Sequence, residues 1–90
     1  MRKDQALLSQ ISLKNKYALE QLYDRFHLIL MKVIHTSIQD PMLSEQILKQ
    51  LFKEIWDNPA HFDQRIVSSA MIRRCKEIVK ESKRFQKLVN

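Results

Sequence analysis

The stretch Pro41–Trp56, PMLSEQILKQLFKEIW, decides the predicted fold of this chain. Its apolar residues recur at steps of three and four, which places them on one broad face of a helix. They are Leu43, Ile47, Leu48, Leu51, Phe52 and Ile55. Asp40 is a favourable N-cap, and Pro41 suits the first helical position because its missing N–H would be unpaired there anyway. A helix with so much apolar surface needs neighbours that cover it.

Three other segments of the chain can provide that cover. Asp4–Ile11 reads as a short helix, and after a polar break residues 16–38 read as a long one. The predicted core face of the long helix consists of Leu19, Leu22, Phe26, Ile29, Leu30 and Val33. Residues 65–86 read as the last helix, with Asp63 as its cap. Its apolar face consists of Val67, Met71, Cys75, Ile78, Ser82 and Phe85.

The composition supports a helical chain. Glycine is absent, and the only two prolines, Pro41 and Pro59, flank the central helix. Tight β-hairpins favour Gly, Asn-Gly or Asp-Gly, and none of these occurs here. We therefore expect residues 1–90 to form a single all-α domain, a compact three- to four-helix bundle.

Several classes of protein do not fit this sequence. The longest apolar run falls well short of the roughly 20 residues that span a bilayer, and the N-terminus leads into no signal-like apolar segment. The single Cys75 excludes an internal disulfide and suits a reducing cytoplasm. We therefore expect a cytoplasmic protein without a membrane partner.

No pattern in the sequence predicts catalysis. His27 and His35 are eight residues apart, and with Cys75 they do not form the close set of four ligands that structural zinc needs. Neither a Ser-His-Asp arrangement nor a glycine-rich phosphate loop is visible. We therefore expect that the chain is not an enzyme and that it binds no metal, no cofactor and no small-molecule substrate.

The net charge of +6 comes from the end of the chain. Residues 1–64 hold eight basic and eight acidic side chains, whereas residues 65–90 hold eight basic and two acidic ones. Lys76, Lys80, Lys83 and Lys87 share one side of the last predicted helix, where Arg65 and Arg73 join them. Such a stripe can follow nucleic-acid phosphates, although membrane-surface and calmodulin-binding helices show the same pattern.

Three stretches together resemble region 2 of extracytoplasmic-function sigma factors. Ala6–Phe26 is similar to the opening of that region, with Ala18, Leu22 and Tyr23 at the matching positions. Ser44–Trp56 is similar to the central helix of the family, where Glu45, Phe52 and Trp56 match by type and spacing. The loop Asp57–Asp63, DNPAHFD, follows the tryptophan as the variable loop of the family does.

The resemblance implies a domain of transcription initiation that docks on the clamp helices of RNA polymerase and captures a base of the promoter −10 element. The residues expected to bind polymerase are Glu45, Gln46, Lys49, Gln50 and Lys53. The residues expected to bind DNA are Asn58, His61, Phe62, Arg65, Arg73, Lys76, Lys80, Lys83 and Lys87. An anti-sigma factor is a further candidate partner, and the −35-binding domain of the family is expected to be absent.

A second reading stays open beside the first. The family has an acidic residue where Gln46 stands and a Gln-Glu pair where Lys49-Gln50 stands. These departures favour a sigma-like protein-interaction module that does not read promoters. For the loop, the alternative to base capture is that Phe62 closes one end of the bundle and His61 is solvated.

Overall fold

The computed structural model describes the backbone of residues 2–89 and the side chains of residues 3–84. The described chain is all-helical, and no strand occurs in it. It consists of the α helices α1 (Arg2–Ser12), α2 (Lys16–His35), α3 (Pro41–Asp57) and α4 (Val67–Val89), and of the short 3-10 helix η1 (Pro59–Phe62). The predicted fold class, an all-α bundle, is confirmed.

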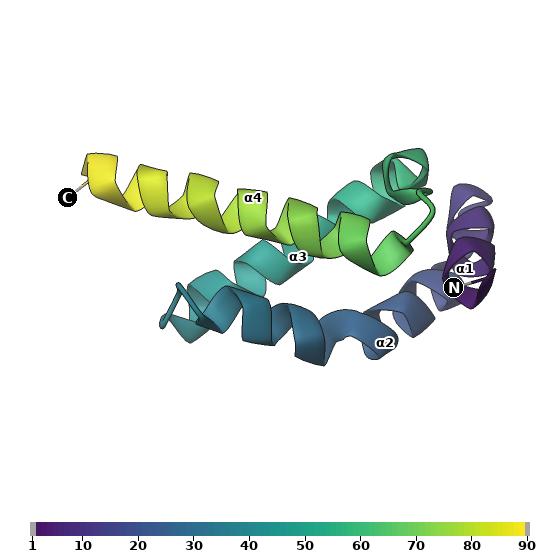
Figure 1. Cartoon of the computed structure of the whole chain (residues 1–90), viewed down its shortest axis with the longest axis horizontal. Helices are drawn as coiled ribbons and strands as arrows, with labels where there is room; N and C mark the ends of the chain where they lie inside the picture. Colours follow the sequence, from purple (N-terminus) through teal and green to yellow (C-terminus); the bar gives the residue numbers. More distant parts are fainter. Residues whose placement is uncertain (1, 90) are drawn as a thin grey trace.

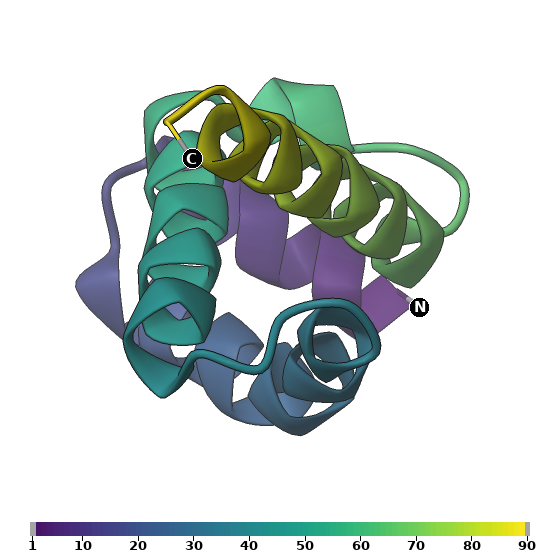
Figure 2. The ribbon, with the colours of Figure 1, turned by 90° about the vertical axis from the view of Figure 1, so that its left-hand side faces the viewer.

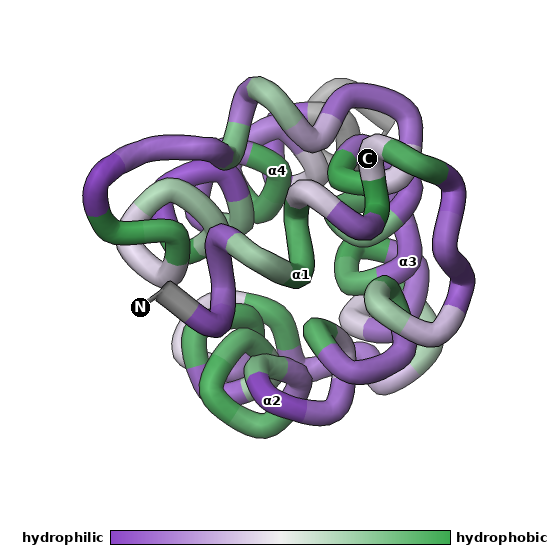
Figure 3. The backbone as a smooth tube through the Cα atoms, turned by 90° about the vertical axis from the view of Figure 1, so that its right-hand side faces the viewer, coloured by the Kyte–Doolittle hydropathy of each residue, from purple (hydrophilic) through white to green (hydrophobic). Residues whose placement is uncertain are grey.

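The helices α2, α3 and α4 surround a common core, and α1 lies across one end of the bundle (Figures 1 and 2). The antiparallel helices α2 and α3 are joined by a short turn, residues 36–40. The last turns of α4 extend past this connection (Figure 1). Hydrophobic positions of α3 face the centre of the bundle, whereas hydrophilic ones follow its outward side (Figure 3).

Local signals set the bounds of α3 as predicted. The Asp40 carboxylate accepts hydrogen bonds from the N–H groups of Met42 and Leu43, at 2.9 and 3.4 Å. These bonds satisfy two of the donors that every helix start leaves free. Asn58 ends the helix and donates its N–H to the Glu54 carbonyl. The inner face is buried from Ile47 to Ile55.

The link between α1 and α2 is a Schellman turn without glycine. The N–H of Asn15 binds the Gln10 carbonyl at 3.1 Å, and that of Lys14 binds the Ile11 carbonyl at 2.8 Å. Lys14 has a φ of 63°, in the left-handed region, which is energetically unfavourable for most residues other than glycine. Its ammonium group donates to the Trp56 carbonyl at 2.8 Å and lies 4.7 Å from the centre of the Trp56 ring. These contacts connect the turn to the end of α3.

Two details of the predicted helices are wrong. Ile29 was expected in the core but is 48% exposed, whereas Ile34, outside the predicted face, is fully buried. The buried side of α2 is therefore rotated relative to the predicted one. The last helix begins at Val67 rather than near residue 65, and Asp63 ends η1 instead of capping α4.

Candidate functional site

The outward side of α3 carries the residues that the sequence assigned to polymerase binding. Glu45, Gln46, Lys49, Gln50 and Lys53 are all exposed. The polar and the apolar residues of α3 each recur at steps of three and four, so the polar ones lie on the side of the helix opposite the buried ones. We refer to these five residues as the α3 face.

One member of the α3 face has an intramolecular partner. The Gln50 amide donates a hydrogen bond to a carboxylate oxygen of Glu54 at 3.4 Å. A partner that docks on the α3 face would therefore meet a Gln50 side chain that already has a contact within the chain. The other members of the α3 face make no side-chain hydrogen bond or ion pair with the residues whose side chains are described.

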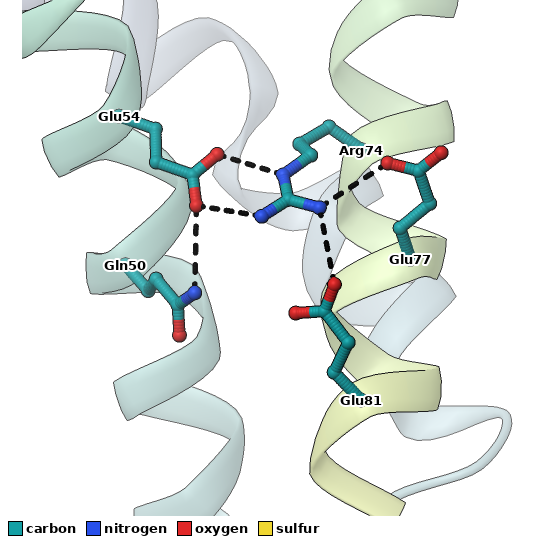
Figure 4. A network of polar contacts seen from close by, with 5 residues as sticks. All are labelled: Gln50, Glu54, Arg74, Glu77 and Glu81. Carbon is teal, nitrogen blue, oxygen red and sulfur yellow. Dashed lines mark hydrogen bonds and ion pairs between the residues drawn. The ribbon is translucent and has the colours of Figure 1, made fainter.

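Arg74 connects α4 to this part of α3 (Figure 4). Its guanidinium binds both carboxylate oxygens of Glu54, at 2.7 and 3.0 Å, and contacts Glu77 and Glu81 at 3.2 and 3.4 Å. The hydrogen bond from Arg74 lowers the pKa of Glu54, and the same bond raises the pKa of Arg74. Three carboxylates thus surround one guanidinium, so Arg74 is committed to the contact between the helices.

The basic side chains predicted to bind DNA lie outside this network. Arg73, Lys76, Lys80 and Lys83 are exposed. Arg84 is exposed as well and falls on the same side of α4, eleven residues after Arg73. No ion pair joins these five residues, which we call the α4 stripe, to any side chain within residues 3–84. The sequence analysis missed Arg84, although its spacing from Arg73 could have identified it.

Two of the basic residues predicted to bind DNA, Arg65 and Lys87, are not part of the α4 stripe as described. Arg65 is exposed but precedes α4, because the helix begins at Val67. It therefore cannot share the helical spacing of the others. The side chain of Lys87 lies outside the described residues.

In the loop that was expected to capture a base, the His61 ring is accessible and the Phe62 ring is not. Phe62 is only 4% exposed and belongs to the hydrophobic core, whereas His61 and Asn58 are exposed. Phe62 closes one end of the bundle, as the alternative to base capture by this loop expected. Its ring is not accessible for stacking on a base in this conformation.

The structure also contains a groove that the sequence analysis did not identify. It lies between α2 and α3, has a volume of about 500 Å³ and is mainly apolar. We call it the α2–α3 groove. It is lined by Tyr23, His27, Met31, His35, Gln39, Pro41, Glu45 and Leu48. Glu45 therefore belongs both to the groove and to the α3 face.

The single thiol considered in the sequence analysis is not accessible in the structure. Cys75 is fully buried, and burial raises the pKa of its thiol to about 11, which disfavours the reactive thiolate. Among the described residues, no three His, Cys, Asp or Glu side chains gather in a way that could hold a metal ion. No helix within residues 2–89 has both the length and the apolar character needed to cross a membrane.

Comparison with known proteins gives no further identification: no family model, no curated protein and no solved structure matches the chain.

Proposed function

We propose that this chain is a sigma region 2-like domain of bacterial transcription initiation that binds the clamp helices of RNA polymerase and single-stranded DNA of the −10 element. The observation that carries the proposal is the presence of two exposed polar surfaces on different helices of one core. These surfaces are the α3 face and the α4 stripe. The resemblance to extracytoplasmic-function sigma factors assigns the first to polymerase and the second to DNA.

The α3 face is suited to protein binding because its scaffold is rigid. The opposite side of α3 is buried at Ile47, Leu51 and Ile55, each of which is at most 2% exposed. A docking surface on such a helix loses little conformational freedom when a partner binds. Lys49 and Lys53 are one turn apart there and have no ion pair with the described side chains, so their charges remain available to a partner.

The α4 stripe has the charge and the accessibility that phosphate binding requires. Its members from Arg73 to Arg84 extend over about 16 Å of helix, at 1.5 Å per residue. The acidic side chains nearest to the stripe, Glu77 and Glu81, contact Arg74 instead. The basic residues of the stripe can therefore bind phosphates and release the counterions condensed on them.

The burial of Phe62 favours a second candidate function. A domain that cannot stack Phe62 on a base can still bind polymerase through the α3 face and hold DNA through phosphates alone. Base contacts specify a sequence, whereas phosphate contacts only position the nucleic acid. The second candidate is therefore an interaction module that binds RNA polymerase without recognising the −10 element.

The test of polymerase binding is a titration of labelled chain with RNA polymerase core. We expect the double variant Lys49→Glu/Lys53→Glu to change the dissociation constant by about fivefold or more, because charges within an interface govern its electrostatic complementarity. The direction depends on the charge that the partner presents. Lys32→Glu is the matched control, since Lys32 is exposed on α2 outside both surfaces.

Thermal unfolding of each variant shows whether the fold is retained. Equal affinities of the wild type and the double variant would overturn the role of the α3 face.

A further inference from the structure

The α2–α3 groove lies between two rows of side chains that run along neighbouring helices. Tyr23, His27, Met31 and His35 follow one another at four-residue steps on α2. Residues at this spacing form a continuous ridge on a helix. Pro41, Glu45 and Leu48 form the opposite wall on α3. The twelve residue steps from Tyr23 to His35 correspond to a length of about 18 Å along α2, at 1.5 Å per residue.

The α2 wall contains two aromatic rings that contact each other. The rings of Tyr23 and His27 are stacked with an angle of 2° between their planes and a centroid distance of 5.2 Å. Phe52 supports Tyr23 at 5.0 Å and a tilt of 59°. The Nδ1 atom of His27 is buried and has no hydrogen-bond partner among the described residues. Tyr23 is 36% exposed, so part of its side chain is accessible to a bound group.

The opposite wall contributes the only acidic side chain among the residues that line the groove. Glu45 is exposed, and its carboxylate forms no ion pair or hydrogen bond with the described side chains. Lys49, one turn further along α3, is not paired with it. Met31 and the buried Leu48 are apolar members of the same lining. The groove thus combines an aromatic plane, an apolar floor and a negative charge.

These three features together match one side chain. Arginine has a planar cation that stacks on aromatic rings, a fork of donors that fits a carboxylate, and an aliphatic stem that packs on apolar surface. We propose that the α2–α3 groove binds an arginine side chain of the protein that docks on the α3 face, with Glu45 as its counter-ion and Tyr23 as its stacking partner. The identity of the partner rests on the proposed function, whereas the chemistry of the bound group rests on the residues that line the groove.

Continuity between the two surfaces is the second argument for a protein ligand. Glu45 belongs to both, so a partner helix on the α3 face can place a long side chain in the groove without a separate binding event. Nucleic-acid phosphate is disfavoured by repulsion from the Glu45 carboxylate. Lysine is disfavoured because its ammonium is a compact, strongly hydrated charge that lacks the plane and the fork of the guanidinium.

The chemistry of the groove can be tested on the chain alone by NMR with methyl-labelled methionine. N-acetyl-arginine amide is titrated into the protein, and the citrulline analogue, which has nearly the same shape but no charge, is the ligand control. We expect a concentration-dependent shift of the Met31 methyl signal with arginine, little with citrulline, and none at the buried Met71. Glu45→Gln should remove most of the shift, whereas Asp24→Asn, on the exposed side of α2, should leave it unchanged.

A Met31 signal that does not move, that responds equally to citrulline, or that is unaffected by Glu45→Gln would overturn the proposal. The same variants are then compared in binding to RNA polymerase core. Glu45→Gln and Tyr23→Leu should weaken binding by roughly three- to tenfold, as loss of a partly exposed charge pair and a stacking contact does.

The two proposals fail in different ways. Polymerase binding that is equal for wild type, Glu45→Gln and Tyr23→Leu would contradict the arginine contact while leaving the proposed function intact. Failure of the wild type to bind polymerase would contradict the proposed function, and the Met31 titration would still decide whether the groove binds a guanidinium group.

Discussion

Arg74 binds Glu54 through two parallel hydrogen bonds, from Nε to Oε1 at 2.7 Å and from Nη2 to Oε2 at 3.0 Å. This bidentate contact joins α4 to α3 (Figure 4). It is the strongest geometry that an arginine and a carboxylate can adopt. Since one helix carries the α4 stripe and the other the α3 face, the contact fixes the two proposed binding surfaces relative to each other.

Removing this contact should destabilise the fold. We expect Arg74→Met to lower the free energy of unfolding by about 1–2 kcal/mol. The loss should be smaller than for a fully buried charged contact, because the Arg74 and Glu54 side chains are 29% and 32% exposed and water weakens their interaction. Glu81→Gln is the matched control: Glu81 is 59% exposed and has one longer contact, so the change should stay within about 0.5 kcal/mol. Urea unfolding measures both. Equal stability of Arg74→Met and wild type would contradict a stabilising role.

The same contact predicts how stability depends on pH. Arg74 lowers the pKa of Glu54 below its ordinary value of 4.5 in the folded chain. The unfolded chain therefore takes up the proton first as the pH falls. The contribution of Glu54 to stability should be complete above pH 4.5 and should decrease as the pH falls below that value.

Thermal unfolding between pH 6 and pH 3 compares wild type with Glu54→Gln. The stability advantage of the wild type should shrink at the acid end of this range. A constant difference over the whole range would contradict the predicted proton linkage.

The core around α3 predicts a large effect of truncation. Leu51 is fully buried, and Leu51→Ala should reduce the free energy of unfolding by about 2–5 kcal/mol through lost apolar burial and the cavity that remains. Leu28→Ala removes the same atoms from a side chain that is 70% exposed, so it should change stability by less than about 0.5 kcal/mol. Similar losses for the two variants, measured by urea unfolding, would be incompatible with the described core.

The α4 stripe predicts a defined salt dependence of binding to a single strand. Each phosphate contact should contribute about 0.7 to the slope of log affinity against log salt, so three to five contacts give roughly −2 to −3.5. Lys80→Ala should make the slope less negative by about 0.7 and should weaken binding to all sequences alike. Lys32→Ala, outside the stripe, should leave the slope unchanged. Fluorescence anisotropy on a labelled strand at several salt concentrations provides the measurement.

The loop variant His61→Ala tests base recognition in the same assay. Loss of sequence preference with an unchanged salt slope would indicate that His61 contacts a base, because base contacts carry specificity. Identical behaviour of His61→Ala and wild type on every sequence would favour the interaction module that does not read promoters.

Local sequence signals were sufficient to predict α3. Its apolar periodicity, the Asp40 cap and Asn58-Pro59 all act within a few residues, so they could be read without a structure. The core face of α2 was predicted less well, because Ile29 and Ile34 are both apolar and only the packing of neighbouring helices decides which is buried. Periodicity defines an arc on a helix but not the rotation of that helix in the bundle.

The candidate site depends more strongly on contacts between distant residues. The α4 stripe followed from spacing within one helix and was largely predictable. The pairing of Arg74 with Glu54 was not, because the residues are 20 positions apart and meet only when α3 and α4 pack. The α2–α3 groove requires the antiparallel arrangement of two helices, and the burial of Phe62 requires η1 to close the bundle.

The most direct measurement of the central claim is the affinity of RNA polymerase core for a labelled single strand of −10 DNA, with and without this chain. We expect the chain to increase this affinity. Lys76→Ala/Lys80→Ala should weaken the effect through lost phosphate contacts, and Lys49→Glu/Lys53→Glu should change it through altered docking. An affinity that the folded wild-type chain leaves unchanged would contradict the proposed function.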